Sequence, residues 1–368
     1  MKNVHGIILA YHSHPDLGEL CKYRAAAALP VCGRYRLIDF ALSAMMNAGI
    51  FEVDVLMQSG FQSLMEHLNS GRPWNMARNA GGIHFLLEPN EGTYGGASRA
   101  LESVYSHLKG DVREEYVLIT DGDLFANLDL AALVEAHMAS GADMTALCTE
   151  QFVPGLGHRF VPGEDGVTAR ELLCSQTSPD ARGLTSLQTY IMRWSLLEEM
   201  LAWSREGNRL SFHRDALLHF MSEGTRVNIH LHKGYARRIK SVRDYFEVNM
   251  DMLDLTKLIQ IFPMDRHIAT RARSDVSTYY SDTAKVTDSL IADGCMIHGS
   301  VERCILFPGV TVEEGCHLRD CIILNDTTIQ SYTDLSNVIA DKNTSFSSYL
   351  NLSGNRQFPL LIPKGSTL

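Results

Sequence analysis

Three arginines lie close together in the first part of this sequence of 368 residues. They are Arg24, Arg34 and Arg36. A guanidinium group presents several N–H donors in one plane and binds phosphate groups well. The three side chains therefore predict an anion site, suited to inorganic phosphate or to a phosphorylated sugar. A simpler interpretation is an ion pair between Arg36 and Asp39, which lie near the start of a predicted helix and would order the loop before it.

Two polar residues follow segments that we expect to be buried strands. Asp123 comes just after residues 116–120, and Gln58 comes directly after residues 52–57. In a parallel sheet, ligands bind beyond the carboxyl ends of the strands. We therefore expect Asp123 and Gln58 at the edge of the sheet where a ligand site belongs, although a carboxylate in that place can also serve only to position its neighbours.

The elements that position these residues alternate between strands and helices. Short apolar runs predict strands, and apolar residues spaced three and four apart predict helices. The expected strands are residues 5–10, 52–57, 83–87, 116–120 and 142–148, and the expected helices are residues 37–48, 61–69, 97–108, 130–140 and 245–261. This alternation predicts an α/β, Rossmann-like domain with a mostly parallel sheet that is covered on both faces.

The C-terminal part has a different pattern, in which apolar or small residues recur every six positions. One series is Ile291, Ile297, Cys304, Val310, Cys316, Ile322 and Thr328, and a second series is Leu306, Val312, Leu318 and Leu324. A hexad of this kind is typical of a left-handed β-helix, in which one side chain of each hexad points inward. A set of ordinary hairpins is the alternative. We expect a first domain over residues 1–262, a linker over 263–285 and the β-helix over 286–368.

The composition is that of a folded protein without a nucleic-acid partner. Hydrophobic residues make up 45% and charged residues 21%, and 33 basic against 43 acidic residues give a net charge of −10. An acidic chain without a basic block binds nucleic acid poorly. No apolar run approaches the ~18 residues that span a membrane, and no signal-peptide pattern is present. We therefore expect a cytoplasmic protein whose eight scattered cysteines stay reduced and hold no metal.

Four segments, in the same order along the chain, resemble segments of the glucose-1-phosphate adenylyltransferases, also called ADP-glucose pyrophosphorylases. They are residues 32–40 (CGRYRLIDF), 116–123 (YVLITDGD), 245–251 (YFEVNMD) and 294–300 (GCMIHGS). Members of this family transfer an adenylyl group from ATP to glucose 1-phosphate and carry a nucleotidyltransferase domain followed by a left-handed β-helix. The resemblance covers nearly the whole chain and implies the same two domains here.

Several groups that the family uses for catalysis are absent. Its glycine-rich phosphate loop and the arginine of that loop are replaced by residues 11–20 (YHSHPDLGEL), whose side chains would crowd a backbone that must approach phosphate. One family lysine is Ala26 here. The resemblance assigns Gln176 to the position of the lysine that binds the sugar phosphate, so a neutral amide replaces a cation.

The resemblance also implies which positions are remnants of a substrate site. Asp123 matches the first carboxylate that binds Mg²⁺, whereas Arg243 stands in place of the second, where a fixed cation would exclude the metal. The vestigial substrate-binding positions are Gln58, Gly95, Ala97, Asp123 and Gln176. We therefore expect no competent catalytic residue and no metal site in this chain.

A retained fold with lost catalytic groups resembles the non-catalytic, regulatory subunits of bacterial enzymes that contain two kinds of subunit. The resemblance implies a role in glycogen biosynthesis, no tightly bound cofactor, a catalytic partner subunit that uses Mg²⁺, a mixed tetramer, and a sugar phosphate or phosphate as effector. An active nucleotidyltransferase with a remodelled phosphate loop is a second interpretation. A third is a hexapeptide acyltransferase that uses His298 or His317 of the predicted β-helix.

Overall fold

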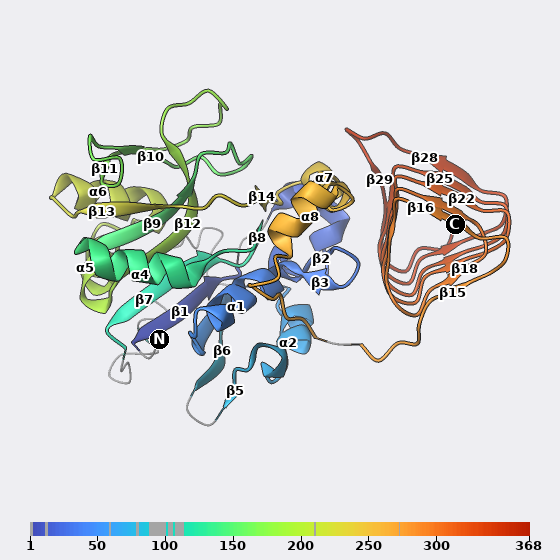
Figure 1. The fold of residues 1–368 in the computed structure, drawn as a ribbon, viewed down its shortest axis with the longest axis horizontal. Coiled ribbons are helices and arrows are strands. Elements are labelled where there is room, and N and C mark those ends of the chain that lie inside the picture. The colour runs from blue at the N-terminus through green and yellow to red at the C-terminus, as the bar shows by residue number, and fades with distance from the viewer. Residues whose placement is uncertain are drawn as a thin grey trace. The chain divides into compact units, whose positions relative to one another are not determined.

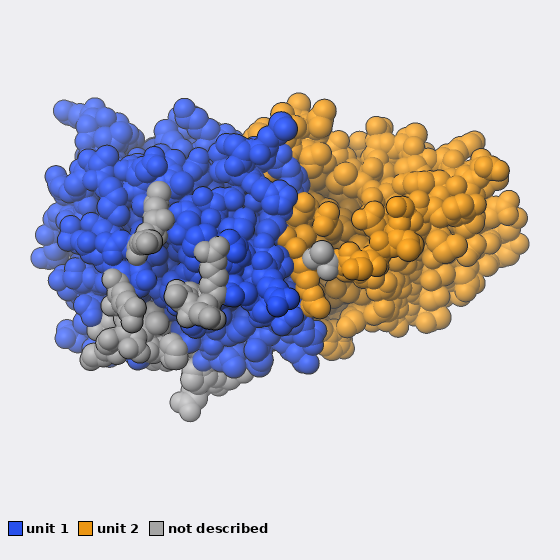
Figure 2. Space-filling model, turned by 60° about the horizontal axis from the view of Figure 1, so that its bottom comes forward, with its two compact units in different colours: residues 1–12, 38–238, 262–269 blue, residues 13–37, 239–261, 270–368 orange. Residues whose placement is uncertain are grey.

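A computed structural model describes residues 3–11, 14–58, 60–78, 81–87, 101, 106, 114–209, 211–271 and 273–368. The chain forms two compact units, which Figure 2 shows in different colours. Unit 1 comprises residues 1–12, 38–238 and 262–269, and unit 2 comprises residues 13–37, 239–261 and 270–368. Residues 13–37 and 239–261 thus group with the C-terminal part, although the sequence predicts a single first domain over 1–262.

Unit 1 is built on a sheet in which ten strands are described (Figure 1). The strand order is β11-β10-β12-β7-β1-β4-β6-β5, with β9 between β12 and β13. The strands are β1 (Val4–Leu9), β4 (Glu52–Met57), β5 (Ala77–Arg78), β6 (Gly81–Leu87), β7 (Tyr116–Asp121), β9 (Met144–Thr149), β10 (Arg159–Pro162), β11 (Ala169–Leu173), β12 (Leu184–Arg193) and β13 (Val227–Leu231). Strands β7, β1, β4 and β6 pair in parallel, whereas β12 is antiparallel to β7 and β9. This is the α/β, mostly parallel arrangement that the sequence predicts.

Helices connect these strands and pack on the sheet. They are α1 (Leu37–Asn47), α2 (Gln62–Leu68), α4 (Leu130–Ser140), α5 (Trp194–Glu206) and α6 (Leu217–Ser222). Gly6 of β1 lets α1 approach closely, because a Cβ atom at this position would lie 3.1 Å from the Sδ atom of Met45. Asp129 caps α4 by accepting a hydrogen bond from the backbone N–H of Ala132. The helix expected over residues 97–108 lies almost entirely outside the described residues.

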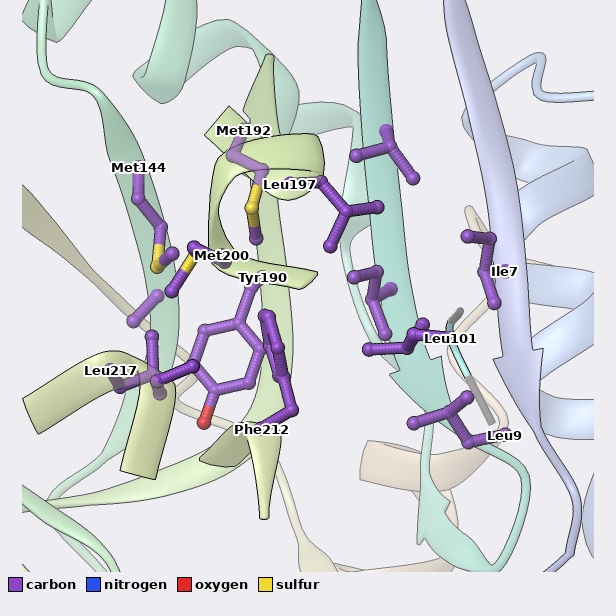
Figure 3. Packing of buried hydrophobic residues seen from close by; sticks show 14 of the residues in the cluster. Ile7, Leu9, Leu101, Met144, Tyr190, Met192, Leu197, Met200, Phe212 and Leu217 are labelled. Atoms are coloured by element: carbon purple, nitrogen blue, oxygen red, sulfur yellow. The ribbon is translucent and has the colours of Figure 1, made fainter. Parts of the chain in front are cut away.

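The core of unit 1 fills the space between the sheet and the helices. Figure 3 shows Tyr190 of β12 beside Phe212, with Met200 and Leu217 next to them. The ring centroids of Tyr190 and Phe212 lie 6.1 Å apart, with their planes at 71°. Because all four side chains are at most 1% exposed, this packing fixes β12 against the helices and holds it beside β7.

The N-terminal and middle segments of unit 2 pack together through buried polar contacts. Strands β2 (Pro30–Val31) and β3 (Tyr35–Arg36) form a hairpin, and helices α7 (Val242–Asp251) and α8 (Leu255–Ile261) follow one another. The hydroxyl of Tyr245 donates to the carbonyl of Pro30 at 2.7 Å. The backbone N–H of Cys32 donates to Asn249 Oδ1 at 3.0 Å. Two residues of the YFEVNMD segment thus hold the hairpin.

The single helix expected over residues 245–261 is wrong, because the chain forms two helices there. Helix α7 ends at Asp251, and the side chain of Asp254 accepts hydrogen bonds from the backbone N–H and the hydroxyl of Thr256. Aspartate competes for backbone donors in this way at helix starts. The apolar periodicity passes through this break, so it predicted helix correctly but not the interruption.

The C-terminal part of unit 2 is the left-handed β-helix that the sequence predicts (Figure 1). Short strands stack in parallel into three sheets of five strands each. One sheet holds β15 (Tyr279–Tyr280), β18 (Met296–Ile297), β21 (Thr311–Val312), β24 (Thr328–Ile329) and β27 (Ser345–Phe346). A second holds β16 (Lys285–Thr287), β19 (Ser300–Glu302), β22 (His317–Arg319), β25 (Asp334–Ser336) and β28 (Asn351–Ser353). The third holds β17 (Leu290–Ile291), β20 (Ile305–Leu306), β23 (Ile322–Ile323), β26 (Val338–Ala340) and β29 (Leu360–Ile362). The first strand therefore lies inside the segment 263–285 that the sequence predicts to be a linker.

The coils repeat mostly every 17 residues, as the pairs Ile305–Ile322 and Cys304–Cys321 show. Inward side chains at 306, 312, 318 and 323 are at most 2% exposed, so the six-residue spacing shortens to five on one face of each coil. The corners use the left-handed backbone region. One column of corners is Gly294, Gly309, Asp326, Asn343 and Gly365, all with φ between 57° and 78°. These residue types tolerate positive φ at little cost.

Among the described residues, no helix is long and apolar enough to cross a bilayer.

Candidate functional site

Two carboxylates lie together at the carboxyl end of β7. Asp121 is the last residue of this strand and Asp123 follows Gly122. Alternate residues of an extended chain face the same side, so both carboxylates share one face. Gly122 faces the other way, where an added Cβ would lie 3.1 Å from both Ile8 and Ile38. The position of Asp123 at the end of a sheet strand is the one that the sequence predicts.

A buried arginine from a distant part of the chain contacts both carboxylates. Strand β14 (Ala236–Arg238) pairs antiparallel with β8 (Leu124–Ala126), which places Arg238 opposite Leu124. Arg238 Nη1 lies 2.9 Å from Asp121 Oδ2, and Arg238 Nη2 lies 2.9 Å from Asp123 Oδ1. The exposed fraction is 4% for Arg238 and 1% for each aspartate. The guanidinium is therefore a fixed, desolvated cation between the two acids.

Gln188 and His213 complete the surroundings of this arginine. Arg238 Nη1 donates a hydrogen bond to Gln188 Oε1. Gln188 lies at an irregularity of β12, where the pairing register with β9 shifts, and its φ is 53°. Strained backbone of this kind collects at functional sites. His213, in a single π turn over Phe212–Ala216, places Nε2 4.0 Å from Asp121 Oδ1.

The charges decide what this site can hold. Burial lowers the pKa of Arg238, but the charges of Asp123 and Asp121 outweigh burial and raise this pKa above its usual value. The arginine is therefore always charged. Mg²⁺ requires carboxylate oxygens at 2.0–2.1 Å, roughly, in an octahedral shell, and here a guanidinium contacts those oxygens. Among the described residues, no group of three acidic, histidine or cysteine side chains is placed to hold a metal ion. The residues as they stand do not fit Mg²⁺.

Arg243, the residue that the resemblance places at the second metal-ligand position, forms a local ion pair within its own helix. It is on α7 in unit 2, its side chain is 55% exposed, and Nε donates to Glu247 Oε1 at 2.8 Å. Such an i,i+4 pair stabilises the exposed face of a helix. The guanidinium that contacts Asp123 belongs to Arg238, five residues earlier in the chain.

The other vestigial positions are described only in part. Gln58 is half-buried directly after β4, in accordance with the expected edge of the sheet. Gly95 and Ala97 lie outside the described residues. Gln176 is half-buried, its backbone N–H donates to the carbonyl of Gly157 at 2.8 Å, and its Nε2 donates to the carbonyl of Cys174 at 3.2 Å. Its amide therefore serves the local turn.

The three arginines of the predicted anion site have separate environments in unit 2. Arg24 is 5% exposed, and its Nη2 lies 2.8 and 2.9 Å from the two carboxylate oxygens of Asp341. Its Nη1 is buried and has no hydrogen-bond partner among the described residues. Arg34 is exposed and lies over the ring of Tyr35 at 5.6 Å. A guanidinium with an unsatisfied buried donor is a group that an anion would stabilise.

The positive charge of Arg36 acts on Lys342, a lysine of the β-helix. Burial, and then the positive charges of Arg36 and Arg24, lower the pKa of Lys342 to about 8. Lys364 lowers it further, while Asp341 raises it. The charges of Arg24 and Arg36 thus both act on Lys342, a residue that the sequence analysis did not single out. Asp39, the alternative partner of Arg36, lies with its Oδ1 2.6 Å from His67 Nε2.

The sequence carries only part of the signal for Arg238. Two acids in alternate positions at the end of a buried strand need a counter-charge. Buried arginines are rare unless paired, but the three residues of β14 are too few to identify Arg238 as a buried arginine.

Comparison with known proteins defines the class to which this fold and site belong. The sequence model of the family described as "Nucleotidyl transferase" matches residues 6–153. These residues include β1, β7 and both carboxylates. A second model, described as "GlmU-like, C-terminal hexapeptide", matches residues 275–356, which form the β-helix. The chain is therefore a nucleotidyltransferase-fold protein with a hexapeptide domain.

Relatives over the whole length give the particular family. The chain is 30% identical to the glucose-1-phosphate adenylyltransferase of Pseudothermotoga lettingae over 85% of this chain and 76% of the relative. It is 30% identical to that of Bacillus licheniformis over 83% and 82%, and 31% identical to that of Halalkalibacterium halodurans over 84% and 82%. The chain belongs to the glucose-1-phosphate adenylyltransferase family, as the four sequence segments predict.

Proposed function

We propose that this chain is a regulatory, non-catalytic subunit of glucose-1-phosphate adenylyltransferase that acts on a catalytic subunit in glycogen biosynthesis. The observation that carries the proposal is the buried ion pair of Arg238 with Asp121 and Asp123. A family member that forms ADP-glucose needs cations to neutralise the triphosphate at the transition state. Here the two acids at the strand end already have a cation from the protein.

The residue at the position of the sugar-phosphate lysine supports the same role. A neutral amide, Gln176, stands where the resemblance places the lysine for the sugar phosphate, and it bonds to its own turn. Catalytic groups that act as a unit lose their effect together. We therefore assign ATP, Mg²⁺ and the bond-forming step to the partner subunit in a mixed tetramer, in the cytoplasm.

The same proposal includes an effector site on unit 2. The positive charges of Arg36 and Arg24 lower the pKa of Lys342, and Nη1 of Arg24 has no hydrogen-bond partner among the described residues. An inorganic phosphate or a sugar phosphate would supply acceptors to these groups. Arg34, which is exposed and lies over Tyr35, is at most a peripheral member.

The test is ADP-glucose formation from ATP and glucose 1-phosphate with Mg²⁺, by this chain alone and mixed with a catalytic subunit of the same family. We expect no turnover by the chain alone and a changed rate, substrate affinity or phosphate response in the mixture. The matched control is a mixture with the Arg24→Ala, Arg36→Ala chain, which should lose the phosphate response and keep the rest.

The other two interpretations predict different assay results. Turnover by the chain alone would establish an active nucleotidyltransferase and overturn the proposal. Acyl transfer from acetyl-coenzyme A would establish the third interpretation. His317 is exposed on the outer face of β22, and the ring of His298 lies 5.7 Å from that of Tyr279. An unchanged rate, substrate affinity and phosphate response in the mixture would refute the regulatory role.

A further inference from the structure

Oxygen atoms of three residues converge on one buried guanidinium in unit 1. Arg238 contacts carboxylate oxygens of Asp121 and of Asp123 and the amide oxygen of Gln188. Two further contacts, at 3.1 and 3.3 Å, join Nη2 and Nε to Asp123 Oδ2. Carboxylate and amide oxygens are also the ligands that hard divalent cations prefer. The shell around the arginine therefore has the chemistry of a cation site whose occupant is a side chain.

We propose that Arg238 permanently takes the place of a divalent cation between Asp121 and Asp123, and that removal of its guanidinium opens a site for Mn²⁺ or Mg²⁺. The inference deepens the proposed function, because a site closed to metal accounts for a chain without turnover. It concerns binding of a metal rather than catalysis, so the two can fail separately.

The neighbouring structure keeps the oxygens in place when the arginine is removed. Asp121 ends β7, whose pairing with β1 extends to the pair Leu9–Asp121. Gly122 packs against Ile8 and Ile38 on the opposite face. Gln188 is on β12, whose Tyr190 pairs with Ile119 of β7. The sheet therefore positions the oxygen atoms that would bind a metal, and the guanidinium is not needed to hold them in place.

Electrostatics explains why the arginine and a metal exclude each other. Two cations a few ångströms apart repel strongly in a buried site, where the effective dielectric is low. Conversely, two carboxylates without any counter-charge are costly to bury. The site must hold one cation, and the covalently attached one has an effective concentration that free Mg²⁺ cannot match.

The experiment measures Mn²⁺ binding by the full chain, from the electron paramagnetic resonance signal of free Mn²⁺. The variants are Arg238→Ala and Arg238→Ala with Asp123→Asn. The matched control is Arg237→Ala, because Arg237 is the neighbour of Arg238 on β14 and lies over the ring of Tyr235 at 5.2 Å. We expect the Arg238→Ala chain to bind one Mn²⁺ at least about tenfold more tightly than the wild type. The double variant and the control should bind as the wild type does.

Two results would overturn the inference. One is a folded Arg238→Ala chain that binds Mn²⁺ no better than the wild type, or binds it equally well after Asp123→Asn. The other is a wild-type chain that already binds one Mn²⁺ which Asp123→Asn removes. Should Arg238→Ala not fold in EDTA, added Mn²⁺ must restore the cooperative thermal transition, and failure to do so also overturns it. Turnover by the wild type would refute the proposed function without deciding the identity of the cation.

Discussion

Two groups of charged residues, one in each unit, differ in the counter-charge that each contains. In unit 1, one guanidinium faces two carboxylates, and every member is at most 4% exposed. In unit 2, Arg24 pairs with Asp341, and the positive charges of Arg36, Arg24 and Lys364 act on Lys342. The first cluster is closed by its own side chain. The second has an excess of cations and a buried donor without a partner among the described residues. In the first group the protein supplies the counter-charge itself, whereas in the second the proposed phosphate ligand would supply it.

The largest effect is expected from removing the closing charge in unit 1. Arg238→Met should lower the free energy of unfolding by about 3–5 kcal/mol, because it leaves two buried carboxylates without a cation. Urea denaturation measures the change. Arg237→Ala should stay within about 0.5 kcal/mol of the wild type. An equal loss of stability in the Arg238→Met and Arg237→Ala chains would contradict this prediction.

A smaller effect is expected from the corresponding change in unit 2. Arg24→Ala should cost about 1–3 kcal/mol, because Asp341 loses one partner but keeps others. The backbone N–H of Lys342 still donates to Asp341 Oδ1 at 2.7 Å, and the other cations remain. Thermal and urea denaturation of both variants rank the two clusters. A loss for Arg24→Ala greater than that for Arg238→Met would reverse the ranking.

The third expected effect concerns pH. The pKa of Lys342 is lowered to about 8 by burial and by Arg36 and Arg24. Between about pH 8 and the ordinary lysine value near 10.4, the unfolded chain binds a proton that the folded chain does not. Stability should therefore rise with pH across this window, by at most about 1.4 kcal/mol per pH unit from this group.

Urea denaturation at several pH values tests this, with Lys342→Met as the control that loses this contribution. Inorganic phosphate should raise the pKa of Lys342 in the folded chain, because a bound anion favours the charged lysine. The rise in stability should then begin at a higher pH. A wild type and a Lys342→Met chain with the same pH profile would show that the pKa of Lys342 is not lowered, and a wild-type profile that phosphate leaves unchanged would show that no anion binds beside this lysine.

Much of the fold could be predicted from local patterns. Strand β4 and helix α4 have the predicted bounds, because short apolar runs and helical spacing reflect burial directly. Helix α1 ends before Gly49, whose φ is 72°. The β-helix followed from its inward side chains. The interruption at Asp254 and the segments shared between the units depend on contacts that local periodicity does not record.

The site was predictable only in part. Asp123 could be placed because the end of a parallel strand is a known ligand position. Arg238 could not, because 115 residues separate it from Asp123 and β14 is too short to show a pattern. Likewise Asp341 lies 317 residues from Arg24. Ion pairs between residues far apart in the sequence form only in the tertiary fold. The sequence therefore indicated which arginines could bind an anion, but not which acids they contact.

The regular coil of the β-helix sets the unit in which this chain can change length. Each strand pairs only with its counterparts one coil before and after, mostly 17 residues away. Insertion or deletion of one whole coil preserves all three sheets and the column of corners described above. A coil of another length must keep the strands in register: the pairs Lys285–Ser300 and Leu290–Ile305 are 15 residues apart and still belong to their sheets. The last coil is longer: Val338 pairs with Leu360, and the additional residues loop out between β28 and β29. The domain can therefore gain or lose whole coils, and additional residues are tolerated where they leave the coil as a loop.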